Sequence, residues 1–300
     1  MELGVLVEPE AIKRLESIEK DKLHIIFNKI KDNPPLTLSE GMLDAYMIPS
    51  IHVKKRKRDR KFHSIRDWSI FINTRYEALK DIIMNKIDTK NLISINKVSG
   101  GRVGIIGLVR SKKDNIIDIE DQSGTLKVLI SMDTAEKVKE DDVIYVLGDY
   151  NSNILHASDV VWPDVPLGKV NQSDFKVKAV FASNKDVSDI DVSDITYLLI
   201  WKCTGWEQLS DKYPDLNVEV VSDETNPCMI DIGGLNVLVY FGDEVPESVL
   251  KRRFINLDKE DFIVEEAPDI FFTNSKMKNY KGITILDNGL INLHTREVIV

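Results

Sequence analysis

Few of the residues that could do chemistry in this sequence stand in a known catalytic pattern. The glycine-rich stretch 100–104 lacks the Gly-Lys-Ser/Thr ending of a phosphate-binding loop and leads into an apolar run, so we interpret it as a turn. Gly-x-Ser-x-Gly and His-Glu-x-x-His motifs are absent. Cys203 and Cys228 have no histidine near them in sequence, which favours small buried side chains over nucleophiles or metal ligands.

Four aspartates lie close together at Asp186, Asp189, Asp191 and Asp194. A calcium-binding loop would also need a glycine and a terminal glutamate, which this stretch lacks. These carboxylates are therefore predicted to be solvated loop residues. The two cysteines and five scattered histidines do not have the spacing of a zinc site.

A basic run is the clearest candidate for binding. Seven of its eight residues are cations: Lys54, Lys55, Arg56, Lys57, Arg58, Arg60 and Lys61. Such a run attracts phosphates through counterion release without reading base sequence, so it predicts DNA contact. The alternatives are a solvated linker and a tether to an acidic partner surface.

Helical patterns flank the basic run. Pro9 suits the first turn of a helix, and apolar residues recur at helical spacing from Ala11 to Ile30. Residues 1–48 are therefore predicted to be a small helical region and residues 49–66 a basic linker. Thr74 and Glu77 have capping-box spacing, which predicts a further helix that begins at Thr74.

From residue 94 the apolar period changes to two, which is typical of strands. Five short strands separated by turn residues are predicted: Arg102–Arg110, Asn115–Glu120, Thr125–Ser131, Val143–Leu147 and Ile154–Val161. An insertion after the third strand is typical of an OB-fold barrel, although a generic five-stranded barrel or sheet has the same periodicity. Tyr145 is the only aromatic residue in 102–147, which favours protein docking over base stacking.

The C-terminal part and the charge distribution indicate a second partner surface. Residues 171–300 alternate apolar strands with helical or loop segments, which predicts an α/β or β-sandwich domain with one core. They carry 13 basic and 23 acidic residues, a balance of −10, whereas residues 1–100 carry 19 and 14, a balance of +5. No run of about eighteen apolar residues occurs and residues 1–4 open no signal peptide, so a soluble intracellular protein is expected.

Three segments carry a resemblance to a known family. Residues 68–79 resemble the helix before its OB domain, and residues 116–129 resemble the central hairpin of that domain. The most specific match is Asp-Val-Val-Trp-Pro-Asp-Val-Pro at 159–166, which is similar to the segment that leaves the OB domain. Over roughly residues 68–300 the sequence resembles the small subunit of archaeal D-family DNA polymerase, which is related to the B-subunits of eukaryotic replicative polymerases.

The resemblance implies a second domain of the calcineurin-like phosphoesterase type, a 3′–5′ exonuclease that uses two divalent metals. Each metal-ligand motif that the resemblance locates is altered in this sequence. The altered positions are Asn184, Asp186, Cys203, Phe241, Ser275 and Met277. Lys202 stands beside the place of the bridging aspartate, and His294 is the only histidine after residue 170. The resemblance therefore implies a degenerate site.

We predict a mixed α+β protein in which residues 67–170 form a helix and a five-stranded OB-fold barrel, and residues 171–300 a shortened, degenerate phosphoesterase-like α/β sandwich. It would be a non-catalytic scaffold subunit of a replicative DNA polymerase, cytoplasmic and nucleoid-associated. Its partners would be the large catalytic subunit and DNA, with no cofactor, catalytic metal or membrane. Candidate interface residues are Trp162, Pro163, Trp201 and Trp206.

Two alternatives belong to other functional classes. A surviving metal-dependent 3′–5′ exonuclease is disfavoured by the missing ligands. A stand-alone OB-fold protein that binds single-stranded DNA is disfavoured by the barrel's lack of aromatic residues.

Overall fold

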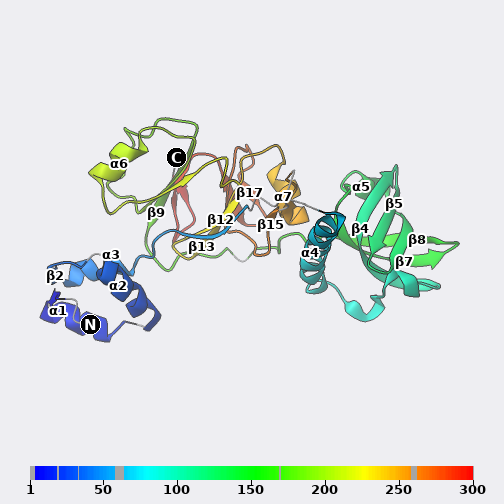
Figure 1. Ribbon diagram of the computed structural model, residues 1–300, viewed down its shortest axis with the longest axis horizontal. Coiled ribbons are helices and arrows are strands. Elements are labelled where there is room, and N and C mark those ends of the chain that lie inside the picture. The colour runs from blue at the N-terminus through cyan, green and yellow to red at the C-terminus, as the bar shows by residue number, and fades with distance from the viewer. Residues whose placement is uncertain are drawn as a thin grey trace.

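The computed structural model describes residues 4–18, 20–32, 34–57, 64–168, 170–257 and 262–299. Figure 1 shows three parts along the longest axis of the molecule. An N-terminal helical unit lies at one end, a domain of two sheets in the middle, and a barrel with one long helix at the other end. The chain therefore contributes to the central domain before it enters the barrel, and returns to that domain afterwards.

The N-terminal unit contains three helices, α1 (Pro9–Glu16), α2 (Lys20–Asp32) and α3 (Glu40–Met47). Pro9 occupies the first turn of α1, where its missing N–H leaves no hydrogen bond unmade. Two short parallel strands, β1 (Leu6–Val7) and β2 (Thr37–Leu38), pair beside the helices. The core of this unit is small and consists of Ala11, Ile26, Ile30, Leu38 and Leu43.

The long helix α4 (Ile65–Met84) precedes the barrel and begins earlier than predicted. Its N-cap is Ser64, whose hydroxyl accepts a hydrogen bond from the backbone N–H of Asp67 at 3.2 Å. Thr74 lies inside the helix, where its hydroxyl donates to the carbonyl of Ile70 at 2.8 Å. The capping-box prediction at Thr74 is therefore wrong, because Ser64 already satisfies the first turn.

The barrel has five strands: β4 (Gly101–Lys113), β5 (Ile116–Asp121), β6 (Gly124–Leu129), β7 (Val143–Asn151) and β8 (Ile154–Val161). The closed order is β4-β5-β6-β8-β7, in which β6 and β8 run parallel and the other pairs antiparallel. A short helix, α5 (Met132–Ala135), lies in the predicted insertion between the third and fourth strands. Two 3₁₀ turns, η1 (Thr89–Asn91) and η2 (Ile95–Lys97), connect α4 to β4. This strand order is that of an OB-type barrel.

The central domain contains two facing sheets. The five-stranded sheet is formed by β11 (Asn217–Val221), β10 (Tyr197–Trp201), β9 (Lys178–Ser183), β19 (Gly289–Asn292) and β20 (Val298–Ile299), in that order. The six-stranded sheet is formed by β17 (Asn279–Tyr280), β18 (Ile283–Leu286), β16 (Ile270–Phe272), β13 (Leu235–Val239), β12 (Cys228–Ile232) and β3 (His52–Arg56). A separate short pair joins β14 (Phe254–Ile255) to β15 (Phe262–Ile263).

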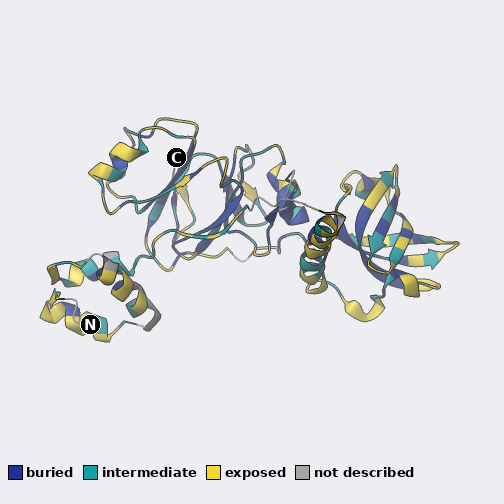
Figure 2. Cartoon of the chain, in the orientation of Figure 1, coloured by how far each residue is buried: buried dark blue, intermediate teal, exposed yellow. Residues whose placement is uncertain are grey.

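Helices cover the outer faces of both sheets. The largest core lies between the sheets and includes Phe181, Tyr197 and Phe272. Helix α6 (Trp206–Lys212) contributes Leu209 to a second core on the five-stranded sheet, and α7 (Pro246–Arg252) contributes Val249 and Leu250 to a third on the six-stranded sheet. Figure 2 shows these strands buried and α6 exposed on its outer side, whereas α7 is largely buried. The result is a four-layer α/β sandwich.

Strand β3 corrects the prediction of a solvated linker over residues 49–66. Residues 52–56 pair antiparallel with β12 and form one edge of the six-stranded sheet. Ile51 and Val53 pack against the core between the sheets, so burial of these two apolar residues holds the charged segment in place. Arg58, Arg60 and Lys61 lie outside the described residues.

Candidate functional site

The altered ligand positions come together at one rim of the central domain. Asn184 follows β9, Cys203 follows β10, and Phe241 and Ser275 follow β13 and β16. In each sheet these strands are parallel neighbours, so their carboxyl ends meet at the same edge. The rings of Trp201 and Phe241 stack across the two sheets and place both edges at one rim.

An aromatic stack occupies the centre of this rim. The ring centroids of Trp201 and Phe241 are 4.7 Å apart with an interplanar angle of 1°. Phe241 also meets Phe272 edge to face at 4.8 Å, and Phe272 meets Phe181 at 5.3 Å. Trp201 is buried and Phe241 is half-buried, so the stack closes the end of the apolar core.

The polar groups of the rim are engaged within the chain. The Lys202 ammonium lies 3.0 Å from a carboxylate oxygen of Asp223 and 5.0 Å from the centre of the Trp201 ring. The Cys203 thiol donates to the carbonyls of Ala182 at 3.3 Å and Trp201 at 3.4 Å.

Asp186 is exposed at the rim. Its carboxylate accepts from the backbone N–H of Ser188 at 2.8 Å, a hydrogen bond that lowers the pKa of Asp186.

The donor set at the rim does not fit a pair of divalent metals. Hard cations need carboxylate, carbonyl or imidazole ligands, and the Phe241 ring offers none of these. Met277 offers none either, and its side chain packs against the third core, on the outer face of the six-stranded sheet. Among the residues that the structure describes, no group of three His, Cys, Asp or Glu side chains is placed to hold a metal ion. His294 Nδ1 donates to the Ser173 carbonyl, 2.7 Å away, near the start of β9 and thus at the opposite end of the sandwich from the rim.

The basic run on β3 faces acidic residues of its own domain. Lys54 lies 3.6 Å from Asp231 and 3.4 Å from Glu266, and it also donates to the Asn236 side chain. Because β3 carries cations and the surrounding surface is acidic, these ion pairs support the edge strand.

The next cations of the run also have partners within the domain, two of them carboxylates and one a backbone carbonyl. Lys55 pairs with Glu265 at 2.8 Å, and Arg56 pairs with Glu219 at 3.1 Å. Lys57 donates to the carbonyl of Asp223 at 2.6 Å.

The most specific family segment, residues 159–166, connects the barrel to the central domain. Asp164 accepts from Lys281 at 2.5 Å and from the Tyr280 hydroxyl at 3.2 Å, and Lys86 of the α4 end contacts the carbonyls of Pro163 and Asp164. Burial lowers the pKa of Lys86 to about 8. Pro163 is buried within this junction.

A buried ion pair forms the second half of the junction. Asp142, at the start of β7, accepts from Arg252 Nε at 2.5 Å, from Trp162 Nε1 at 3.1 Å and from the backbone N–H of Lys139 at 3.0 Å. The Lys251 ammonium lies 3.6 Å from the centre of the Trp162 ring. These contacts join α7 to the barrel, so they fix the two domains to each other.

The four candidate interface residues fall into two groups. Trp162 and Pro163 belong to the junction between domains. Trp201 is a core residue with 4% of its surface exposed, so its buried ring is unavailable as a surface anchor for a partner. Trp206 is half-buried on α6 against the second core.

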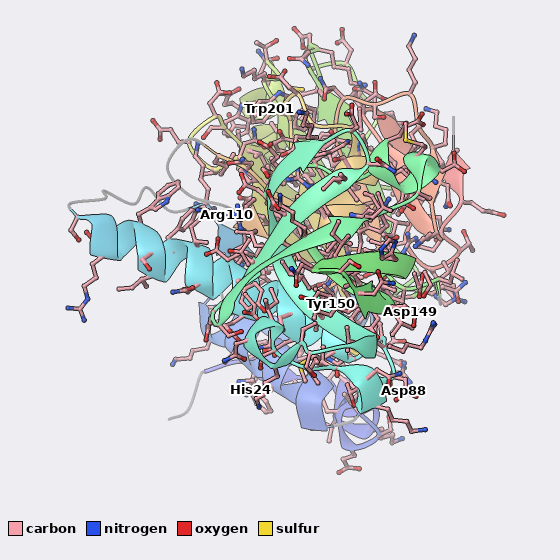
Figure 3. All side chains as sticks on the ribbon, turned by 90° about the vertical axis from the view of Figure 1, so that its right-hand side faces the viewer. His24, Asp88, Arg110, Asp149, Tyr150 and Trp201 are labelled. Carbon is pink, nitrogen blue, oxygen red and sulfur yellow. The ribbon has the colours of Figure 1, made fainter. Side chains whose placement is uncertain are left out.

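The barrel strands carry few aromatic residues. Figure 3 looks onto the barrel end of the molecule, with Arg110, Asp149 and Tyr150 on the barrel. Tyr145 is buried over Gly104, where an added Cβ would lie 2.5 Å from the tyrosine hydroxyl. Tyr150 is half-buried and packs against the barrel core. Neither ring offers the open stacking platform that single-stranded nucleic acids use.

Together, the fold and the rim define a class: a protein that joins an OB-type barrel to an α/β sandwich through a buried junction. No helix in the described part of the chain is long and apolar enough to span a membrane. No family model matches the chain.

The chain is similar to curated archaeal proteins named DNA polymerase II small subunit. It is 28% identical over 235 residues to the one from Methanothermobacter thermautotrophicus, a match that covers 65% of this chain and 47% of the relative. It is 29% identical over 128 residues to the one from Archaeoglobus fulgidus, covering 40% of this chain and 26% of the relative. These matches confirm the resemblance to the small subunit of archaeal D-family DNA polymerase. The chain spans less than half the length of these relatives.

Two solved structures are similar to about a quarter of the chain. The telomere capping protein Ten1 from Saccharomyces pombe has a TM-score of 0.21 at 18% identity, covering 24% of this chain and 79% of Ten1. The ygiW protein from E. coli has a TM-score of 0.22 at 16% identity, covering 25% of this chain and 92% of that protein.

Proposed function

We propose that this chain is a non-catalytic scaffold subunit of an archaeal D-family-type DNA polymerase, and that its sandwich is a degenerate calcineurin-like phosphoesterase. The observation that carries the proposal is the rim, where Trp201 stacks on Phe241 and Lys202 pairs with Asp223. The similarity to polymerase small subunits supports the assignment to such a complex.

The chemistry of the rim supports the loss of catalysis. A two-metal phosphoesterase stabilises both the attacking and the leaving oxygen with cations held by carboxylates and histidines. An aromatic stack excludes such ions because they would lose their hydration without gaining ligands. The Lys202 ammonium would further repel a divalent cation.

The remaining architecture suits a scaffold. The junction around Asp142 and Asp164 holds the barrel and the sandwich as one body, which would present a fixed surface to the large catalytic subunit. The balance of −10 over residues 171–300 favours a basic docking face on that subunit.

DNA contact by the basic run is a second part of the proposal. Lys54, Lys55, Arg56 and Lys57 already have partners in the chain, so a phosphate would have to displace these groups. We therefore expect a weaker salt dependence than seven free cations would give.

A nuclease assay tests the proposal. The pure protein is incubated with Mn²⁺ and 5′-labelled single-stranded DNA, and the products are examined for a ladder of strands that differ by one nucleotide. We expect no shortening from the 3′ end. Shortening that requires Mn²⁺, copurifies with the chain and is abolished by Asp186→Ala would overturn the non-catalytic assignment and establish the nuclease alternative.

A further inference from the structure

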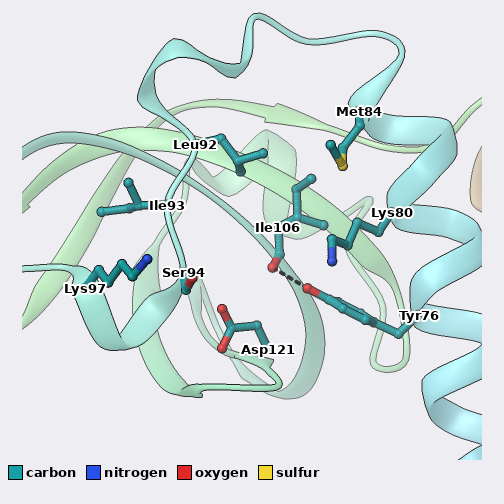
Figure 4. Close-up of a pocket in the computed structure, with 9 residues that line it drawn as sticks. All are labelled: Tyr76, Lys80, Met84, Leu92, Ile93, Ser94, Lys97, Ile106 and Asp121. Atoms are coloured by element: carbon teal, nitrogen blue, oxygen red, sulfur yellow. Dashed lines mark hydrogen bonds between the residues drawn. The ribbon is translucent and has the colours of Figure 1, made fainter.

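A groove runs between α4 and the barrel, well away from the rim (Figure 4). One wall is formed by Tyr76, Lys80 and Met84, which lie on one face of α4 because residues four apart along a helix are neighbours. The facing wall contains Leu92 and Ile93 from the connection between η1 and η2, and Ile106 of β4. The groove encloses about 290 Å³.

The floor of this groove is apolar and held in place. The Tyr76 hydroxyl donates to the carbonyl of Ile106 at 3.0 Å, which ties α4 to β4 beneath the groove. Leu79 and Ile83 of the same helix are fully buried against the barrel. Met84 is 39% exposed, and Figure 4 shows its side chain directed toward Leu92 and Ile106 across the groove.

Two lysines supply the positive charge of the groove. Figure 4 shows the Lys80 ammonium pointing between Tyr76 and Ile106, and it keeps one carboxylate neighbour, Glu77, at 3.1 Å. Lys97 lines the groove from η2 and is exposed.

The lining acid does not neutralise these lysines by direct contact. The Oδ1 atom of Asp121 accepts from the backbone N–H groups of its own turn, Ser123 at 2.7 Å and Gly124 at 3.0 Å, and its Oδ2 atom accepts from the backbone N–H of Ile95 on η2 at 2.9 Å. The groove therefore offers ammonium donors beside an apolar floor, which is complementary to a carboxylate next to an apolar side chain.

We propose that this groove binds an extended segment of a partner protein in which bulky apolar residues alternate with carboxylates. Adjoining hollows share Tyr76 and Asp121 and extend the groove to Ile72. Glu120 also lines this extension, and its carboxylate is paired with Arg110 at 2.8 Å. From Ile72 to Met84 the helix rises about 18 Å, which matches about five residues of extended chain. Base stacking is disfavoured because Tyr76, the only aromatic residue among the described residues that line the groove, is buried. This inference is independent of the proposed scaffold function.

A peptide titration tests the proposal on the intact protein. The probe is a fluorescein-labelled Gly-Ser-Asp-Phe-Asp-Leu-Ser-Gly peptide, with one control that carries Lys for both Asp and another that carries Ser for Phe and Leu. Anisotropy reports binding, and the ¹³C-methyl resonance of Met84, assigned with Met84→Leu, reports its location. We expect the probe alone to bind and to shift the Met84 resonance.

Variants of the lysines test the charge argument. Lys80→Gln combined with Lys97→Gln should weaken binding of the probe about 3- to 10-fold, because each exposed ion pair contributes modestly. Lys90→Gln, an exposed lysine on η1 that does not line the groove, should leave binding unchanged.

Three results would overturn the proposal. One is an unshifted Met84 resonance at 2 mM probe, and another is equal binding of the lysine control. The third is a shift caused by a twelve-residue oligothymidylate and not by the probe, which would make the groove a nucleic-acid site. None of these measurements involves the large subunit, so their outcome is separate from that of the scaffold proposal.

Discussion

Removal of the Asp142 carboxylate should destabilise the junction between barrel and sandwich more than any surface ion pair could. The Asp142 side chain is fully buried and the Arg252 side chain is 9% exposed. Asp142→Ala would leave the Arg252 guanidinium with Glu244, at 3.1 Å, as its remaining carboxylate partner. It would also leave Trp162 Nε1 and the backbone N–H of Lys139 without their acceptor.

The magnitude follows from burial. Breaking a buried ion pair by removing one partner costs about 3–5 kcal/mol, because the other charge stays desolvated. Glu244 retains part of the compensation for Arg252, while the two orphaned donors each add about 1 kcal/mol or more. We therefore expect Asp142→Ala to lower the free energy of unfolding by about 3–5 kcal/mol, a large part of the stability of an ordinary domain.

The assay is urea unfolding followed by tryptophan fluorescence, since Trp162 reports on the junction directly. The matched control is Glu120→Ala, which breaks the Arg110–Glu120 pair on the barrel surface at 2.8 Å with side chains 55% and 43% exposed. That control should cost less than about 1 kcal/mol. Equal losses for the two variants would refute the reasoning, because burial and not distance is the claimed cause.

Three further predictions concern other parts of the molecule. Burial raises the pKa of Tyr76, Tyr197 and Tyr280 above the ordinary value of 10.0, so the folded protein keeps protons that the unfolded chain releases. The contribution of these tyrosines to the free energy of unfolding is complete below pH 10 and declines above it. Urea midpoints that stay constant from pH 9 to 11 would contradict this effect. Trp201→Ala should cost about 3–5 kcal/mol in thermal or urea unfolding, since it removes a core ring, and a loss below 1 kcal/mol would contradict the stack. Replacement of residues 54–58 by serine should flatten the slope of the logarithm of the DNA association constant against the logarithm of salt concentration. That slope would be about −5 to −6 if seven cations met phosphates. An unchanged slope would exclude the run as a DNA contact.

Much of the fold follows from apolar residues that recur with the period of a strand, two residues, or of a helix, about 3.6 residues. The five barrel strands lie where runs rich in Val, Ile and Leu predict them, because these side chains line the core of the barrel. The segment at 159–166 connects the barrel to the sandwich, but no sequence pattern around Asp164 indicates that this residue holds the junction. Trp162 and Pro163 could be selected as interface candidates from their residue type alone. Asp164 could not, because its hydrogen-bond partners, Tyr280 and Lys281, lie on a segment far away in the sequence.

The features that local patterns missed depend on long-range contacts. Strand β3 has the composition of a solvated arm, and only Ile51 and Val53 hint that one face is buried. Its pairing with β12 joins segments far apart in the chain. The Asp142–Arg252 pair likewise joins residues 110 positions apart. Neither the strand pairing nor the ion pair produces a repeating pattern in the local sequence. The sequence therefore predicts the elements but not the contacts between them.

If the chain is a non-catalytic docking scaffold in which the sandwich takes part, the sandwich must contribute to its affinity for a large catalytic subunit of D-family polymerase. The full chain and a barrel fragment of residues 64–166, checked for folding by circular dichroism, are compared by sedimentation with that subunit. We expect a stoichiometric complex with the full chain and severely weakened binding by the fragment. Equally tight binding by the barrel fragment would contradict the claim, because the barrel alone would then carry the interaction.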